Sequence, residues 1–173
     1  MKLMKRILAI VCTFVMIISM ATGVNAVDNT SAAATAKPTT GTITVTNAKA
    51  GETYKVYKIL SLESYDDSKK AYSYVKNPVG DKWNDFVNNS RDYLEINKDG
   101  YVTFVAGKDN PEGAREFALK AMDYAKKNKI DATTTATASE GKDTDITVKF
   151  ENLSLGYYLV ESSVGTACSI DTA

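Results

Sequence analysis

The feature of this sequence that most constrains its fold is the segment from Phe150 to Ser163, near the C-terminal end. Its pattern predicts a strand, a tight turn that includes Gly156, and a second strand. The second strand contains the apolar run Tyr157-Tyr158-Leu159-Val160 and ends at a carboxylate, Glu161. The segment therefore predicts a β-hairpin in which an acidic side chain directly follows an apolar stretch.

Alternating polar and apolar residues predict further strands at the N-terminal side. Residues 42–46 alternate threonine with β-branched apolar residues, and residues 53–63 form a longer strand after a turn at 47–52. In the longer strand, simple alternation places Lys58 on one face together with four apolar residues, Tyr54, Val56, Leu60 and Leu62. Lysine is unusual on such a face, so Lys58 is a candidate functional residue.

The middle and the end of the chain carry more strand signals. A tyrosine-rich strand is expected at 71–75, after a polar loop at 66–70, and a hairpin is expected from 93–96 and 101–105. Asp99-Gly100 marks the hairpin turn, because glycine accepts the positive φ that such turns require. Residues 131–145 are polar and rich in threonine and alanine, which predicts a loop, and 146–150, 156–161 and 166–170 are the closing strands.

Two helices are expected between these strands. Trp83, Phe86 and Val87 have the i, i+3, i+4 spacing of a short amphipathic helix over 81–88, capped by Asp81. A longer helix follows Asp109 or Asn110, with Pro111 in its first turn, lysines at its C-terminal end and a buried stripe of small and apolar residues, Ala114, Phe117, Ala118, Ala121, Met122 and Ala125. About seven strands surrounding central helices predict a β-sandwich with a helical insertion, a mainly β fold of α+β type.

The first 26 residues have the features of a signal peptide. Three basic residues precede an apolar run of about 14 residues, which is shorter than the ~20 that a membrane span requires. Cleavage is expected between Ala26 and Val27, after which residues 27–40 form a Thr/Ala-rich linker and residues 41–173 form one domain. The membrane is then a partner only during export, and the mature chain is expected outside the cell.

Composition excludes several classes of function. The chain contains no histidine, which removes Ser-His-Asp catalysis and the usual zinc sites, and the mature chain keeps only one cysteine, Cys168. The 18 basic and 21 acidic residues left after cleavage do not suggest a nucleic-acid partner. Three acidic residues, Glu140, Asp143 and Asp145, lack the spacing of a calcium loop. We therefore expect a protein that is not an enzyme and that has no metal and no cofactor.

Several motifs, taken in order, resemble one family. They are Gly41-Thr42-Ile43-Thr44-Val45, Tyr54-Lys55-Val56-Tyr57-Lys58-Ile59, the helix that begins Pro111-Glu112-Gly113-Ala114, and Gly156-Tyr157-Tyr158-Leu159-Val160-Glu161. Together with the signal peptide and the linker, they resemble the N-terminal domain of the major subunits of Gram-positive fimbriae (pili) assembled by sortases. The resemblance covers essentially all of the mature chain and implies an Ig-like β-sandwich.

The resemblance also implies how such a protein works. It would be a structural subunit of a cell-wall fimbria, with other copies of the subunit and a pilus-specific sortase as partners. The sortase joins an LPxTG-type motif of one subunit to a lysine of the next, often in a Tyr-Pro-Lys motif. Neither motif occurs in this sequence. The chain is therefore expected to be an N-terminal fragment or a truncated product.

Many domains of this family also form an isopeptide bond between a lysine and an asparagine beside a buried acid. Here the candidates are Lys58, Asn152 and Glu161, although the family's lysine normally lies in the first strand. The chemistry requires a neutral amine and a protonated acid, which burial favours. In the alternative interpretation, Lys58 extends to solvent and Glu161 is a charge at a strand end. For the whole protein, the alternative to a fimbrial shaft subunit is a surface adhesin that binds a host or matrix ligand.

Overall fold

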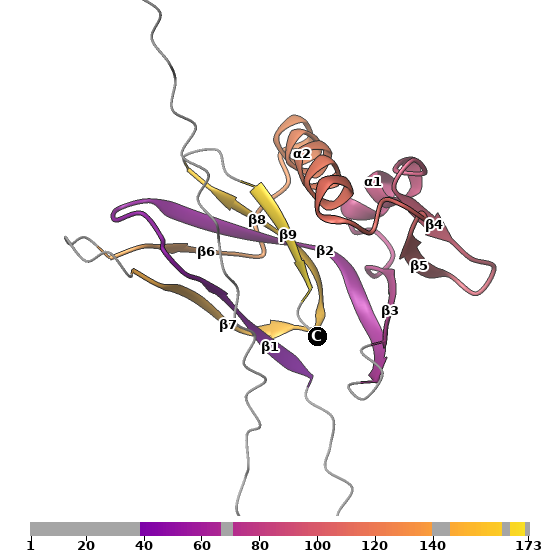
Figure 1. Ribbon diagram of the computed structural model, residues 1–173, viewed down its shortest axis with the longest axis horizontal. Helices are drawn as coiled ribbons and strands as arrows, with labels where there is room; N and C mark the ends of the chain where they lie inside the picture. Colours follow the sequence, from indigo (N-terminus) through magenta and orange to yellow (C-terminus); the bar gives the residue numbers. More distant parts are fainter. Residues whose placement is uncertain (1–38, 67–70, 140–145, 164–166, 172–173) are drawn as a thin grey trace, which may run out of the picture.

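The computed structural model describes residues 39–66, 71–139, 146–163 and 167–171, with only the backbone path given for residue 71 and residues 167–171 (Figure 1). The predicted signal peptide, its cleavage point between Ala26 and Val27, and the acidic residues at 140, 143 and 145 lie outside these residues. So does most of the predicted linker, and its last residue, Thr40, is already the first residue of a strand.

Nine strands and two helices make up the described residues. They follow one another as β1 (Thr40–Val45), β2 (Thr53–Asp66), β3 (Ala71–Lys76), α1 (Trp83–Asn89), β4 (Leu94–Ile96), β5 (Tyr101–Phe104), α2 (Pro111–Asn128), β6 (Thr134–Thr137), β7 (Val148–Ser154), β8 (Gly156–Ser162) and β9 (Ala167–Asp171).

The strands form two antiparallel sheets. The smaller sheet consists of β1 and β7, and the larger has the order β4-β5-β3-β2-β8-β9, with β6 pairing to the first residues of β2. Figure 1 shows α2 on the opposite side of the larger sheet from β1 and β7. The fold is therefore mainly β with two helices and two sheets, which confirms the prediction at this level.

Strand β8, which lies between β2 and β9 in the larger sheet, is covered on both faces. Tyr157 and Leu159 belong to the apolar cluster that includes Phe117 of α2, whereas Tyr158 and Val160 belong to the cluster beneath the smaller sheet. Successive side chains of a strand point to opposite faces, so burial on both faces requires a continuous apolar run. This arrangement explains the apolar stretch, but the predicted hairpin is wrong. The two strands belong to different sheets, because β7 pairs with β1 whereas β8 pairs with β2 and β9.

The prediction of which face of β2 carries Leu60 is wrong. Simple alternation places Leu60 with Val56, but Leu60 packs with Tyr57 and Ile59 in the cluster beneath α2. The cause is a β-bulge: Lys58 pairs with Tyr158, and Leu60 pairs with Tyr157, so that β2 has one additional residue at this point. An additional residue reverses the faces that follow it.

The predicted loop over 131–145 is wrong in part, because it contains β6. Residues 134–137 pair with residues 53–56 of β2, and Ala138 is buried beneath the smaller sheet. Threonine is β-branched and favours strands, but the segment has too few apolar residues to show a strand pattern.

Both predicted helices are present, but the predicted cap of α1 is wrong: the residue before the helix is Lys82, and no side chain caps it. The Asp81 carboxylate lies one residue earlier and accepts a hydrogen bond from the Trp83 backbone N–H at 2.8 Å. In α2 the Asn110 side chain accepts one from Gly113 at 2.8 Å, and Pro111 occupies the first turn. The predicted buried stripe of α2 is confirmed except at Ala114, which is half-buried while Gly113 is buried.

Candidate functional site

The partners of β2 change along one of its edges, and the change leaves a gap. On this edge β6 pairs with residues 53–56, and β3 pairs with β2 from Leu60 onward, so no strand pairs with residues 57–59. Two side chains replace the missing strand: Asn77 donates to the Lys58 carbonyl at 2.9 Å, and the Lys58 N–H donates to Thr133 Oγ1 at 2.9 Å. Since buried backbone groups need partners, these contacts explain why Asn77 is buried.

A cavity of about 460 Å³ lies at this gap. It is bounded by the β3–α1 loop, the α2–β6 loop and the middle of β2, and its wall includes Lys58, Asp81, Lys82, Trp83 and Asp131. The cavity thus combines charged groups with a buried tryptophan, Trp83, and a small polar ligand could use both.

The Lys58 side chain is half-buried and has an uncharged partner. Its Nζ donates to Ser154 Oγ at 2.8 Å, and the Tyr158 hydroxyl donates to the Ser154 carbonyl at 2.7 Å. A Cβ at position 156 would lie 2.3 Å from the Leu60 carbonyl oxygen and 2.6 Å from Lys58 Cε, so Gly156 leaves room for the β2 backbone and for the lysine side chain.

The surroundings of Lys58 disfavour its charged form. Burial lowers the pKa of the Lys58 amine, and the more distant Asp81 carboxylate opposes that change. Burial also raises the pKa of the Tyr158 hydroxyl, so both groups stay closer to neutral than they would in water.

Glu161 has a different environment, close to α2. It accepts a hydrogen bond from the Tyr57 hydroxyl at 3.0 Å, and its other oxygen lies 3.7 Å from Lys126 Nζ. Burial, together with the Glu161 carboxylate, raises the pKa of Tyr57 to about 12. Glu161 therefore ties β2 and β8 to the C-terminal end of α2.

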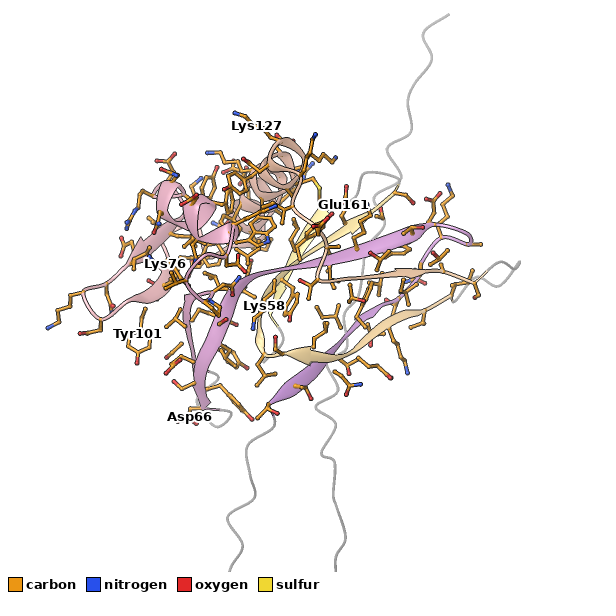
Figure 2. All side chains as sticks on the ribbon, turned by 180° about the vertical axis from the view of Figure 1, so that it is seen from behind. Lys58, Asp66, Lys76, Tyr101, Lys127 and Glu161 are labelled. Carbon is orange, nitrogen blue, oxygen red and sulfur yellow. The ribbon has the colours of Figure 1, made fainter. Side chains whose placement is uncertain are left out.

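The structure does not bring the three isopeptide candidates together. Lys58 pairs across the strands with Tyr158, and Glu161 pairs with Lys55, so the two candidates lie on opposite faces of the larger sheet. Figure 2 shows Glu161 near α2 and Lys58 on the other side of β2. Asn152 is exposed in β7, with a φ of 56°. In the described part of the chain, Lys58 forms no hydrogen bond or ion pair with either Asn152 or Glu161.

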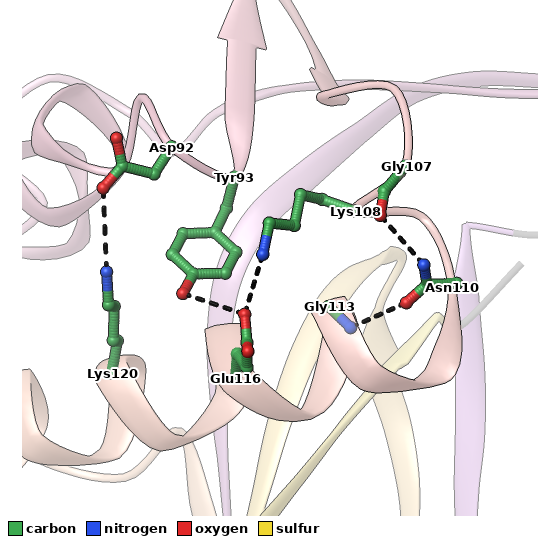
Figure 3. A network of polar contacts seen from close by, with 8 residues as sticks. All are labelled: Asp92, Tyr93, Gly107, Lys108, Asn110, Gly113, Glu116 and Lys120. Carbon is green, nitrogen blue, oxygen red and sulfur yellow. Dashed lines mark hydrogen bonds and ion pairs between the residues drawn. The ribbon is translucent and has the colours of Figure 1, made fainter.

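A second polar network lies at the start of α2 (Figure 3). Lys108 Nζ lies 2.8 Å from Glu116 Oε2, which also accepts a hydrogen bond from the Tyr93 hydroxyl at 3.2 Å. The Lys108 and Lys120 amines lie 5.1 and 4.5 Å from the centre of the Tyr93 ring. This network holds the β5–α2 connection and the start of β4 against the helix.

Sequence reasoning selected Lys58 but missed its partners. Ser154 and Lys58 are separated by 96 positions, and only the register between β2 and β8 brings them together. Gly156 was the available signal, because a glycine at the start of an otherwise apolar strand often marks a close approach of other atoms.

No group of three or more metal-ligating side chains occurs among the described residues. Within the same residues, neither helix is long and apolar enough to cross a membrane. No protein-family model matches the chain, and no curated protein matches its sequence.

Proposed function

We propose that this chain is the N-terminal domain of a structural subunit of a Gram-positive cell-surface fimbria. The observation that carries the proposal is the position of the segment 156–162. In sequence it resembles the second strand of a late strand–turn–strand pattern in such subunits, and as β8 it pairs with β2 and β9 and is covered on both faces. The domain would stack along the shaft, and a pilus-specific sortase would join it to other copies.

The proposal includes an Ig-like β-sandwich as the finer description of the fold. Its support is that residues of both sheets share one apolar cluster, with Ile43, Val148 and Phe150 from the smaller sheet and Val56 and Tyr158 from the larger. The helices and the β4–β5 hairpin would be the insertion that distinguishes the domain from a plain sandwich.

The location that follows is the cell wall, reached by export through the signal peptide. Export agrees with a mature chain that has one cysteine and needs no disulfide, since its described part has two large apolar clusters. No enzymatic activity, metal or cofactor is part of this proposal.

The direct test is an immunoblot of boiled cell-wall extracts from the source organism, with an antibody raised against residues 39–171. We expect a ladder of high-molecular-weight bands, because covalent polymers survive boiling in detergent. The ladder should disappear when the pilus-specific sortase gene is deleted. A single monomer band in both strains would contradict the proposal.

A surface adhesin is the second candidate, and the cavity at the gap in β2 is the observation that favours it. Its lining of charged groups and Trp83 suits a host or matrix ligand such as a sugar. Binding of a glycan array by the wild-type domain, lost in Asp131→Ala and retained in Lys149→Ala, together with a monomer band, would favour the adhesin. Lys149 is the control because it is exposed on β7 and does not line the cavity.

A further inference from the structure

A second cavity, of about 450 Å³, lies on the face of the larger sheet that packs against α2. Its wall is formed by side chains of β2, β3, β4, β5 and β8 and by the residues just before α2. It shares no lining residue with the cavity at the gap in β2. Neither the fimbrial proposal nor the adhesin alternative gives this second cavity a role.

Aromatic rings form a large part of its wall. Tyr72 and Tyr74 of β3 and Phe104 of β5 are half-buried, and Tyr157 of β8 is buried. The centre of the Tyr157 ring lies 6.0 Å from that of Tyr74 and 5.7 Å from that of Phe104, with interplanar angles of 80° and 58°. Rings in such different planes enclose a space instead of forming a stack, and the faces of aromatic rings attract cations.

The charge in this wall is negative. Among the described residues, Asp109 is the only charged side chain that lines the cavity. The sequence offered Asp109 or Asn110 as the cap of α2, and the structure uses Asn110, so the exposed Asp109 carboxylate is not needed by the helix. It also forms no ion pair within the described residues. The carboxylate is therefore available to a ligand.

Two lysines close to the cavity in sequence are held elsewhere. Lys76 follows Tyr74 by two positions on β3, but its Nζ donates to Asn88 Oδ1 of α1 at 3.2 Å. Lys108 directly precedes Asp109, but its Nζ lies 2.8 Å from Glu116 Oε2. Neither lysine lines the cavity. Neither of them therefore neutralises Asp109 or covers the aromatic wall.

We propose that this cavity binds a small quaternary ammonium ion, with choline as the model ligand. The methyl groups of such an ion contact the apolar and aromatic wall, and its positive charge is attracted by the ring faces and by Asp109. A quaternary nitrogen has no N–H group and so needs no hydrogen-bond acceptor. A sugar needs a partner for each of several hydroxyl groups, and this wall offers few polar groups. The binding is non-covalent, and the proposal does not depend on the fimbrial function.

The test is isothermal titration calorimetry of the mature chain, residues 27–173, with choline chloride. The matched control ligand is the uncharged carbon isostere of choline, in which a tert-butyl group replaces the trimethylammonium group. We expect choline to bind with a dissociation constant of about 1 mM or lower. Its affinity should be about tenfold higher than that of the isostere, because the isostere fills the same volume without the charge. This comparison needs no variant.

Two variants locate the site. Tyr72→Leu removes one ring of the wall and should weaken choline binding roughly threefold, whereas Tyr101→Leu changes an exposed tyrosine of β5 outside the cavity and should not. Asp109→Asn should weaken choline binding by a similar factor and leave the isostere unaffected, and its control is Asp123→Asn, at an exposed position on α2. Circular dichroism checks that each variant is folded.

Three results would overturn the proposal. The first is no binding of choline to the wild type. The second is binding of the isostere as tightly as choline, which would make the cavity a site for uncharged apolar ligands. The third is an unchanged affinity for choline in folded Tyr72→Leu or Asp109→Asn, because the cation would then bind elsewhere.

Discussion

Lys58 and Lys108 are both half-buried, but their surroundings act on them in opposite ways. Lys108 is held by Glu116 at the start of α2, and the hydrogen bond to that carboxylate raises the pKa of the Lys108 amine. Lys58 lies against β8 with Ser154 as its partner, and burial lowers the pKa of its amine. The comparison teaches that partial burial alone does not decide whether the pKa of a lysine amine rises or falls. The charge of the group that the amine contacts decides the direction.

Glycine is required beside both lysines, but for different contacts. A Cβ at Gly156 would lie 2.3 Å from the Leu60 carbonyl oxygen as well as 2.6 Å from Lys58 Cε, whereas a Cβ at Gly113 would lie 2.3 Å from the Lys108 carbonyl oxygen. We therefore expect Gly156→Ala and Gly113→Ala each to lower the free energy of unfolding by about 3 kcal/mol in urea titrations.

The control for the glycine variants is Gly107→Ala, since a Cβ at position 107 meets no atom within 4 Å. Its φ of 80° still disfavours alanine, so we expect a loss of about 1 kcal/mol. A loss at Gly156 no larger than that at Gly107 would contradict the close approach of the Leu60 carbonyl and the Lys58 side chain to Gly156.

The hydroxyl groups of Tyr158 and Tyr93 should also differ in how much they contribute to stability. Tyr158 is fully buried and donates to the Ser154 carbonyl at 2.7 Å, whereas Tyr93 donates to the half-exposed Glu116 at 3.2 Å. Tyr158→Phe should cost about 1 kcal/mol, because it removes a part-buried hydrogen bond that the hydroxyl of a fully buried ring donates. Tyr93→Phe should cost less, since water can replace its hydrogen bond. Thermal unfolding of the two variants side by side would measure this difference, and equal losses would count against it.

The stability contributions of the two lysines should depend on pH with opposite signs. The pKa of Lys58 in the folded chain is below the ordinary 10.5, so the wild type should gain stability relative to Lys58→Met as pH rises through the folded pKa toward 10.5. The pKa of Lys108 is above 10.5, so its contribution is fully present below that pH and is lost as pH rises through the folded value. Urea titrations of the wild type and both Met variants at several alkaline pH values test these signs, and parallel curves would contradict them.

Much of the scaffold could be predicted from the sequence, because its elements have local signals. The stripe of α2, the Asp99-Gly100 hairpin and the apolar run of β8 are periodic patterns or turn residues. The bulge in β2 and the strand β6 were missed for physical reasons. A single additional residue leaves no mark in an alternating pattern, and four residues with threonine at three positions resemble a loop.

The site was predictable only in part. The apolar neighbours of Lys58 in the sequence identified it as unusual, but its partner Ser154 is set by the pairing of distant strands. The same pairing places Glu161 on the other face, which no local pattern around Glu161 could show.

The last prediction is that the intact mass of the mature chain does not change on folding. Because Glu161 lies on the opposite face from Lys58 and Asn152 is exposed, we expect the folded mature chain to keep its full sequence mass. Intact mass spectrometry measures this directly. A loss of one ammonia that maps to Lys58 would show that an internal isopeptide bond forms there and that its amine is not free.

The contrast between the two lysines is tested most directly by an NMR titration of protein whose lysine side chains carry ¹³C at Cε. Resonances can be assigned with Lys58→Arg and Lys108→Arg, and the exposed Lys55 and Lys149 provide the reference. We predict that Lys58 loses its proton at a lower pH than the reference lysines and that Lys108 loses its proton at a higher pH. Titration of Lys58 together with or above the reference lysines would contradict the account.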